Sequence, residues 1–350
     1  MKLQTNPYIL QFGKEPVQMI PRLSQIQEVE NSFFDENILQ QIYMITGVRG
    51  SGKTVFMTSI ASKCNEAGWI IINVNVSSST EILKQIAIEL SHNSKIQKNH
   101  EFKSISLSLS TLSLEVGNSE KLTSYEYEAK QLIQIAKKCG YKILITIDEV
   151  TNSSSIREFA GAFQVWVREN LPVYLLMTGL YENIKELQNE KKLTFLYRAP
   201  RIDLAPLSLL AIKENYQTNL DISTEDAIKM AKLTKGYSFA FQALGHEVYK
   251  TNEFNEEALN NYRYTLENLS YDKIWNDLSD NDQKVCLAIA KSKAGKYSTI
   301  KEILHYENNQ LNPYRKRLID KQVVESPRTG YLSFSLPLFD EYILSLEEFE

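Results

Sequence analysis

The residues best suited to chemistry form a short glycine-rich stretch, GVRGSGKT, at positions 47–54. Its glycines at 47 and 52 and its Lys-Thr pair match the spacing G-x-x-x-x-G-K-[ST], with a strand-like run before it and a helical pattern after it. In such a loop backbone N–H groups turn toward phosphate oxygens, the lysine neutralises those oxygens, and the threonine hydroxyl binds Mg²⁺. We therefore predict that ATP and Mg²⁺ are held by Gly47, Val48, Arg49, Gly50, Ser51, Gly52, Lys53, Thr54 and Val55.

A second chemical signal is a pair of acids at the end of an apolar run, ILITIDEV. Asp148, the first of the pair, is suited to hold the Mg²⁺ shell together with Thr54. Glu149 is suited to polarise a water molecule that attacks the terminal phosphate. An ordinary acidic pair at a strand exit is the alternative, and the phosphate-loop motif upstream favours the catalytic interpretation.

Two kinds of hydrophobic pattern alternate along the first 206 residues. Runs rich in β-branched residues are typical of buried strands, and they alternate with segments whose apolar residues have helical spacing. This alternation predicts an α/β fold with a parallel sheet covered on both faces. A period-two segment near 103–116 predicts a β insertion in this core. The expected strands are 42–47, 69–76, 142–150, 172–180 and 201–208, and the expected helices are 55–68, 80–90 and 125–139.

After residue 206 the strand patterns stop and helical patterns continue. Four helical patterns come first, and they predict a small helical domain. Three more helical patterns are followed by the pattern of a two-stranded hairpin, and together these predict a winged helix-turn-helix. Pro313 suits the first turn of the last of these helices. The first four are expected near 208–218, 224–234, 238–250 and 255–267, and the last three at 280–292, 298–305 and 313–321. The predicted domains are thus a core over 1–206, a helical domain over 207–270 and a winged helix over 271–350.

Composition and charge exclude several classes of protein. The chain has 39 Lys and Arg against 43 Asp and Glu, a net charge of -4, so it is not coated in basic charge over its whole surface. Cys64, Cys139 and Cys286 are too far apart for a disulfide framework or a cysteine zinc site. The N-terminus lacks a signal-peptide pattern, and no window of 18 apolar residues predicts a membrane span. We expect a cytoplasmic protein without membrane contact.

Taken together, the loop GVRGSGKT and the strands ILITIDEV and VYLLMTG resemble those of the additional-strand, catalytic-glutamate P-loop ATPases, the AAA+ proteins in particular. A helical lid and a C-terminal winged helix after such a core resemble the origin-recognition and initiator-like group of AAA+ ATPases. The lead-in NPYILQFGKEPVQMIPRLSQI resembles the segment with which that group wraps adenine. The resemblance implies a P-loop NTPase parallel sheet with a helical lid and a winged helix-turn-helix domain, and an ATPase that turns ATP over to ADP.

The resemblance also assigns roles to individual residues. Thr178, at the end of the fourth strand, takes the place of a polar sensor of the γ-phosphate. Arg198 and Arg201 lie where such proteins carry an arginine finger, which acts on the ATP of a neighbouring subunit and so implies a homo-oligomer. Arg22, in the lead-in, is a further arginine candidate. The lid segment at 236–246 lacks the second sensor arginine of many AAA+ proteins, so either hydrolysis is slow or the nucleotide is sensed differently.

Most of the predicted winged helix carries a positive net charge, whereas residues 340–350 carry five acids and no base. Residues 280–339 carry ten Lys and Arg against six Asp and Glu, a net charge of +4. Amide side chains at the start of a recognition helix can reach base edges, lysines and arginines can grip phosphates, and an arginine at a hairpin tip can enter a minor groove. We therefore predict duplex-DNA binding through Asn312, Arg315, Lys316, Arg317 and Arg328.

Two other functions stay open at this point. One is a signalling (STAND-like) ATPase whose winged helix contacts a protein partner instead of DNA. The other is a transposition-helper ATPase that loads a recombinase. DNA binding that weakens with salt is expected of the switch and of the helper, but not of the signalling ATPase.

Overall fold

The structure is a computed structural model, and it describes residues 5–11, 17–35, 40–76, 81–99, 102, 118–191 and 193–347. The β insertion predicted near 103–116 lies outside these residues. The chain divides into two compact units, each formed from more than one segment. Unit 1 comprises Met1–Arg22, Gly47–Gly52 and Leu204–Glu350, and unit 2 comprises Leu23–Thr46 and Lys53–Asp203.

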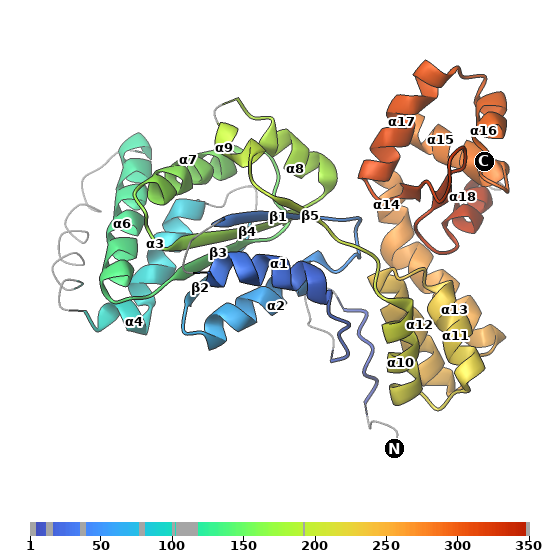
Figure 1. Cartoon of the computed structure of the whole chain (residues 1–350), viewed down its shortest axis with the longest axis horizontal. Coiled ribbons are helices and arrows are strands. Elements are labelled where there is room, and N and C mark those ends of the chain that lie inside the picture. Colours follow the sequence, from blue (N-terminus) through green and yellow to red (C-terminus); the bar gives the residue numbers. More distant parts are fainter. Residues whose placement is uncertain are drawn as a thin grey trace. The chain divides into compact units, whose positions relative to one another are not determined.

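Unit 2 contains a sheet of five parallel strands in the order β2-β3-β4-β1-β5 (Figure 1). The strand β4 therefore lies between β1, which precedes the phosphate loop, and β3, which ends at the acidic pair. This arrangement confirms the predicted parallel α/β sheet. The strand bounds are β1 (Ile42–Thr46), β2 (Ile70–Val74), β3 (Ile143–Ile147), β4 (Val173–Gly179) and β5 (Arg201–Asp203).

Helices cover both faces of the sheet, with α1 and α2 on one side and α7 on the other in Figure 1. The odd-numbered residues of β3, such as Ile145, belong to a buried cluster that also contains side chains of α3, α6, α7 and α8. On the opposite face, Tyr174 of β4 packs against Phe33 of α1 with ring centroids 5.0 Å apart. The helices of this unit are α1 (Leu23–Phe34), α2 (Lys53–Glu66), α3 (Ile82–His92), α4 (Ser94–Gln97), α6 (Asn118–Lys138), α7 (Ser154–Arg168), α8 (Tyr181–Gln188) and α9 (Thr194–Tyr197).

Four helices in unit 1 occupy the positions predicted for the lid. They are followed by one turn of π-helix, η1 (Glu267–Tyr271), and by the short α14 (Asp272–Asn276), which lead into the C-terminal segment. The four lid helices begin and end within two residues of their predicted bounds. They are α10 (Leu209–Asn219), α11 (Thr224–Leu233), α12 (Ser238–Thr251) and α13 (Glu256–Leu266).

The C-terminal module, which we define as residues 280–347, contains three helices, a two-stranded antiparallel hairpin and a last helix. The third helix was expected to begin at Pro313, and this is wrong: it begins at Asn308, because Glu307 and Gln310 form a capping box there. Its elements are α15 (Asp280–Lys291), α16 (Tyr297–Leu304), α17 (Asn308–Asp320), β6 (Val324–Glu325), β7 (Ser333–Phe334) and α18 (Phe339–Glu347).

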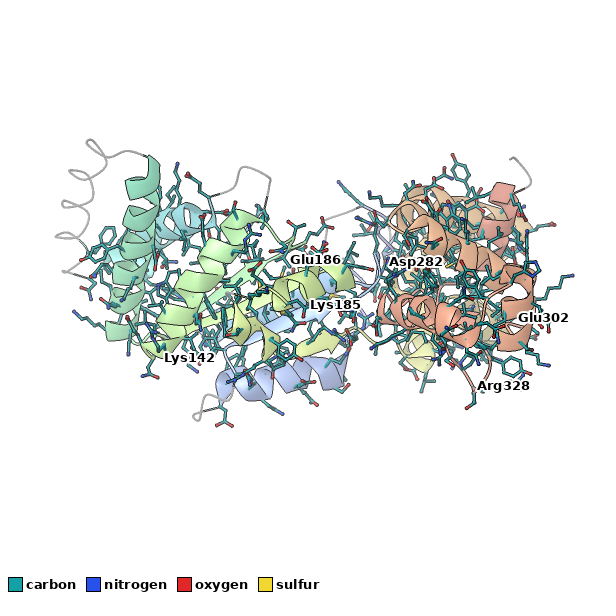
Figure 2. The ribbon with its side chains drawn as sticks, turned by 90° about the horizontal axis from the view of Figure 1, so that it is seen from above. Lys142, Lys185, Glu186, Asp282, Glu302 and Arg328 are labelled. Carbon is teal, nitrogen blue, oxygen red and sulfur yellow. The ribbon has the colours of Figure 1, made fainter. Side chains whose placement is uncertain are left out.

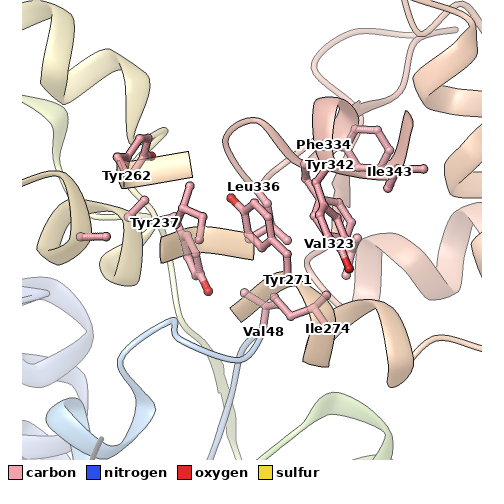
Figure 3. Packing of buried hydrophobic residues seen from close by; sticks show 14 of the residues in the cluster. Val48, Tyr237, Tyr262, Tyr271, Ile274, Val323, Phe334, Leu336, Tyr342 and Ile343 are labelled. Atoms are coloured by element: carbon pink, nitrogen blue, oxygen red, sulfur yellow. The ribbon is translucent and has the colours of Figure 1, made fainter. Parts of the chain in front are cut away.

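One hydrophobic cluster runs through the whole of unit 1 (Figure 3). It joins Tyr262 of the lid, Tyr271 of η1 and Phe334 of the C-terminal module, so lid and module share a core. Val48 of the phosphate loop belongs to the same cluster. Among the described residues, no helix has both the length and the apolar character needed to cross a bilayer.

Candidate functional site

In unit 2, one carboxylate gathers the predicted catalytic side chains. Asp148 follows β3, and Thr54 Oγ1 donates to its Oδ2 at 2.7 Å. Thr178 Oγ1 donates to the other carboxylate oxygen, Oδ1. Because β3 and β4 are parallel neighbours, their carboxyl ends meet at the same edge of the sheet, and this places Thr178 beside Asp148. The structure thus brings together three residues that the sequence singled out separately.

The same oxygens suit a divalent cation. The Thr54 hydroxyl and the Asp148 carboxylate are hard oxygen donors in direct contact, the donor type that Mg²⁺ prefers. In the described part of the chain there is no group of three or more His, Cys, Asp and Glu side chains placed to hold a metal ion. A Mg²⁺ ion at Thr54 and Asp148 would therefore take its remaining ligands from water and phosphate, as is usual for this ion.

Glu149 has an unusual backbone conformation. Its φ is 52°, in the left-handed region that a non-glycine residue adopts only at an energetic cost. Two hydrogen bonds from its N–H hold it there, to Asp148 Oδ1 at 3.0 Å and to Thr178 Oγ1 at 3.2 Å. The exposed carboxylate of Glu149 is therefore presented just beyond the sheet edge by a fixed backbone.

In unit 1, the carbonyl groups of the phosphate loop are held by residues at the start of α12. Tyr237 Oη donates to the carbonyl oxygen of Arg49 at 2.6 Å. The backbone N–H of Phe239 donates to the carbonyl oxygen of Gly50 at 3.1 Å. Two successive peptide units of the loop are thus fixed from their carbonyl side.

The next carbonyl of the loop, that of Ser51, accepts two further bonds. Arg22 Nη2 donates to it at 2.8 Å and Ser238 Oγ at 2.9 Å. Arg22 also donates through Nε to the carbonyl oxygen of Ala205 and through Nη2 to Ser238 Oγ. Burial lowers the pKa of Arg22 to about 10, so its guanidinium is still protonated at neutral pH. Arg22 therefore links the lead-in to Ser51 of the phosphate loop, to Ala205 and to Ser238 at the start of α12.

These bonds determine where the N–H groups of the loop point. In a trans peptide the N–H lies opposite the C=O, so the N–H groups of Gly50 and Gly52 are directed away from the lid contacts. Both glycines have positive φ, 75° and 90°, which allows the chain to curl into an anion-binding nest. Lys53, Thr54 and Val55 then form the first turn of α2, where the helix dipole adds positive potential.

The two predicted finger arginines differ in their surroundings. Arg201 is paired with Asp203, with Nε 3.0 Å from Oδ1 and Nη2 3.1 Å from Oδ2, and its guanidinium lies 4.8 Å from the ring centre of Tyr181. Arg198 ends α9 and is exposed, and its side chain makes no hydrogen bond within the described residues. Arg198 is thus the arginine that remains available to a second molecule.

In the C-terminal module, the half-buried Arg317 is paired with a buried carboxylate. It donates through Nε and Nη2 to the carboxylate of Asp282, at 2.6–2.9 Å. Asp282 is 1% exposed and also lies 3.5 Å from Lys321 Nζ. Of the predicted DNA-binding residues, Arg317 therefore has an internal partner that links α17 to α15.

Among the other predicted DNA-binding residues, Asn312 is exposed and Arg315 is half-buried. Lys316 and Arg328 are exposed, and Figure 2 shows Arg328 projecting from the module. The Arg328 guanidinium lies 3.7 Å from the ring centre of Tyr331, and Arg315 Nη2 donates weakly to Ser326 Oγ at 3.4 Å. Asn312 Oδ1 accepts a bond from a neighbouring tyrosine hydroxyl at 2.9 Å. Three cations and an amide thus lie on or beside α17 and the hairpin.

The predicted adenine-wrapping lead-in packs on α12. Asn6 Nδ2 bonds the ring of His246 at 3.0 Å, and the backbone N–H of Ile9 donates to Gln242 Oε1 at 3.0 Å. The ring of Tyr8 lies directly against Gly245, where an added Cβ would come within 2.6 Å of it. The His246 ring, which also lies 3.0 Å from the carbonyl oxygen of Tyr8, is therefore a packing residue between the lead-in and α12.

Tyr237 and Ser238 were not among the predicted site residues. The signal that could have revealed them is the glycine before them: Gly236 has φ 75°, and a Cβ there would lie 2.6 Å from the carbonyl oxygen of Leu207. A required glycine followed by two hydroxyl residues at the start of a helix marks a turn with polar groups placed for contact.

Comparisons with known proteins agree with this geometry at the level of the fold. No curated protein matches the amino-acid sequence. One family model, described as Domain of unknown function (DUF8462), matches residues 269–343.

Two solved structures resemble nearly the whole chain. A Walker-type ATPase of Pyrococcus abyssi is 15% identical, with a TM-score of 0.66 over 96% of this chain and 99% of that one. The ORC2 protein of Aeropyrum pernix, solved in ADPNP–ADP complexes, is 11% identical, with a TM-score of 0.57 over 97% and 98% of the two chains. The chain therefore has the fold of these two proteins, in agreement with the ATPase fold that the sequence motifs predicted.

Proposed function

We propose that this protein is an ATP-dependent switch that hydrolyses ATP slowly and binds duplex DNA through its C-terminal module. The observation that carries the nucleotide part is the contact of Thr54 and Thr178 with the two oxygens of Asp148. These side chains come from the phosphate-loop helix and from the ends of two neighbouring strands, and Thr54 and Asp148 are of the residue types that hold Mg²⁺ in P-loop NTPases.

In this proposal the nest at Gly50 and Gly52 binds the phosphates through backbone N–H groups, and Lys53 neutralises their oxygens. Thr54 and Asp148 would hold Mg²⁺, which would supply charge neutralisation at the transferred phosphoryl group. Glu149 orients the attacking water and accepts its proton. The exposed Arg198 is the residue that we propose as the arginine finger. Because an arginine finger contacts the ATP of a neighbouring subunit, this proposal requires a homo-oligomer.

The DNA part rests on charge and exposure. Arg315 and Lys316 lie on α17, Arg328 lies in the hairpin, and Arg315 Nη2 is 3.4 Å from Ser326 Oγ of the hairpin. Residues 280–339 have a net charge of +4, and the three acids of α18 lower that of the whole module to +1. Arg317 is left out of the proposed contact because Asp282 already holds its guanidinium. Lysine and arginine contacts to phosphates release counterions, so the affinity should fall with rising salt.

The test is binding of a fluorescent duplex of arbitrary sequence at low and moderate salt, with and without ATP and Mg²⁺. We expect binding that requires ATP and weakens with salt, and a double variant Arg315→Ala, Lys316→Ala that lowers the log–log salt slope by roughly 0.9 for each lost phosphate contact. The matched control is Lys229→Ala, Lys232→Ala, which removes two exposed charges from α11. Equal binding by both double variants would show that α17 is not the DNA-binding helix.

A second function is favoured by one observation, the packing of the phosphate loop in the same unit as the module. Val48 lies in the core that both share, and Arg49 Nε is 3.8 Å from Asp277 Oδ2, just before the module begins. Through these contacts, nucleotide binding at the phosphate loop would control whether the C-terminal module contacts a protein partner. Absence of duplex binding in every condition, together with intact ATP binding, would favour this function.

A further inference from the structure

The hydroxyl group of Tyr237 lies buried between the phosphate loop and the π-helix. It is 2.6 Å from the carbonyl oxygen of Arg49 and 2.7 Å from Ser270 Oγ. Burial raises the pKa of Tyr237 well above its usual value, so the group stays protonated and remains a donor. A phenol has one hydrogen, and since it is donated to Arg49 O, the Ser270 hydroxyl must donate to Tyr237.

The loop leaves room for this hydroxyl by having no side chain at position 50. A Cβ on Gly50 would lie 2.3 Å from Tyr237 Oη and 3.0 Å from Phe239 Cβ. The Tyr237 oxygen therefore touches the loop backbone directly. It fixes the tilt of the Arg49–Gly50 peptide unit, and with it the direction of the Gly50 N–H.

We propose that Tyr237 is a positioning residue for polyphosphate binding: its hydroxyl, itself oriented by Ser270, sets the Arg49–Gly50 peptide so that the Gly50 N–H faces the phosphates. This inference rests on the proposed nucleotide function. It predicts a role in the binding of the phosphates, and none in the binding of the nucleoside, because Tyr237 acts only through the loop backbone.

A matched control exists in the same core. Tyr262 is also fully buried in the cluster of Figure 3, and its hydroxyl has no hydrogen-bond partner among the described residues. Tyr237→Phe and Tyr262→Phe thus remove the same atom from the same kind of environment. Only the first removes a bond to the phosphate loop.

The experiment measures the affinity of the full chain for ATP, ADP and adenosine by calorimetry, together with the KM and kcat of ATP hydrolysis. We expect Tyr237→Phe to weaken ATP and ADP about tenfold, the effect of losing one well-formed hydrogen bond, and to leave adenosine unchanged. KM should rise with little change in kcat, because the bond is the same in the ground state and the transition state. Tyr262→Phe should bind all three ligands as the wild type does.

Three outcomes overturn the proposal. Tyr237→Phe binding ATP as tightly as Tyr262→Phe does would show that the hydroxyl has no positioning role. Equal losses for ATP and adenosine would show a general loosening of unit 1. If the wild type binds neither ATP nor ADP, the proposed function itself fails and this inference fails with it. If Tyr237→Phe does not fold, the variant Ser270→Ala tests the proposal in its place. This variant keeps the Tyr237–Arg49 bond but loses the bond that orients Tyr237, so its affinity for ATP should fall by a smaller factor, about threefold.

Discussion

At the scale of single residues, the chemistry converges on Asp148, and most of that convergence was predictable. Motif spacing predicted a role for Thr54, the acidic pair at a strand end predicted one for Asp148, and the family resemblance predicted one for Thr178. The partners on the carbonyl side of the loop were not predictable in this way. Tyr237 binds a main-chain oxygen, and any suitably placed side chain with an O–H or N–H donor can make such a bond, so no fixed residue type marks the position in the sequence.

Glu149 gives the prediction that belongs to this scale. Glu149→Gln should lower the rate of ATP hydrolysis by about 100-fold or more, because an amide cannot accept the proton of the attacking water. The affinity for ATP should stay unchanged, since the Glu149 N–H bonds that fix the backbone remain. Single-turnover hydrolysis and equilibrium binding measure the two quantities, and hydrolysis at the wild-type rate would rule out Glu149 as the base.

At the scale of elements, hydrophobic periodicity located the strands and the lid helices but not every helix. The helix α7 was not predicted, although it has ordinary signals: Ser153 caps it by accepting from the Ile156 N–H, and Phe159, Phe163 and Trp166 form a buried stripe. The start of α17 was placed five residues late. Pro313 is typical of the first turn of a helix, whereas the capping box formed by Glu307 and Gln310 fixes the start of α17 at Asn308.

Two glycines inside helices should respond in opposite ways to substitution by alanine. Gly245→Ala in α12 should destabilise the protein by about 2 kcal/mol, because the new methyl group overlaps the Tyr8 ring. Gly161→Ala in α7 should stabilise it by about 1 kcal/mol, because nothing lies within 4 Å of the added Cβ and alanine favours helix. Urea unfolding of the two variants measures both changes. Similar shifts for both would refute the packing of Tyr8 on α12.

At the scale of the whole molecule, the two compact units are not consecutive stretches of the chain, because each is built from separate segments. Residues 47–52 belong to the same unit as 204–350, and the lead-in up to Arg22 joins them there. Local periodicity cannot reveal this, because contacts between distant segments leave no repeating pattern in either segment. The aromatic core of unit 1 is the result of that assembly.

This core predicts that four tyrosines ionise only when the protein unfolds. Burial raises the pKa of Tyr216, Tyr237, Tyr262 and Tyr271 above the ordinary value of 10. Because the folded pKa values exceed the unfolded ones, the corresponding stability is complete below pH 10 and falls as the pH rises further. Phenolate absorbance from these four groups should appear only together with the loss of native circular dichroism. Ionisation of the four groups in protein that keeps its native circular dichroism would contradict the buried core.

The bond between Tyr237 and Arg49 also has a consequence for synthesis of the protein on the ribosome. The two residues are 188 positions apart, so the phosphate loop is made long before the residue that orients it. At about 5–20 residues per second, the nascent chain waits roughly 10–40 seconds for that partner. A nascent chain stalled before α12 should therefore contain the complete phosphate loop without the hydrogen bonds to its carbonyl oxygens. Its affinity for nucleotide should appear only once α12 has left the ribosome exit tunnel.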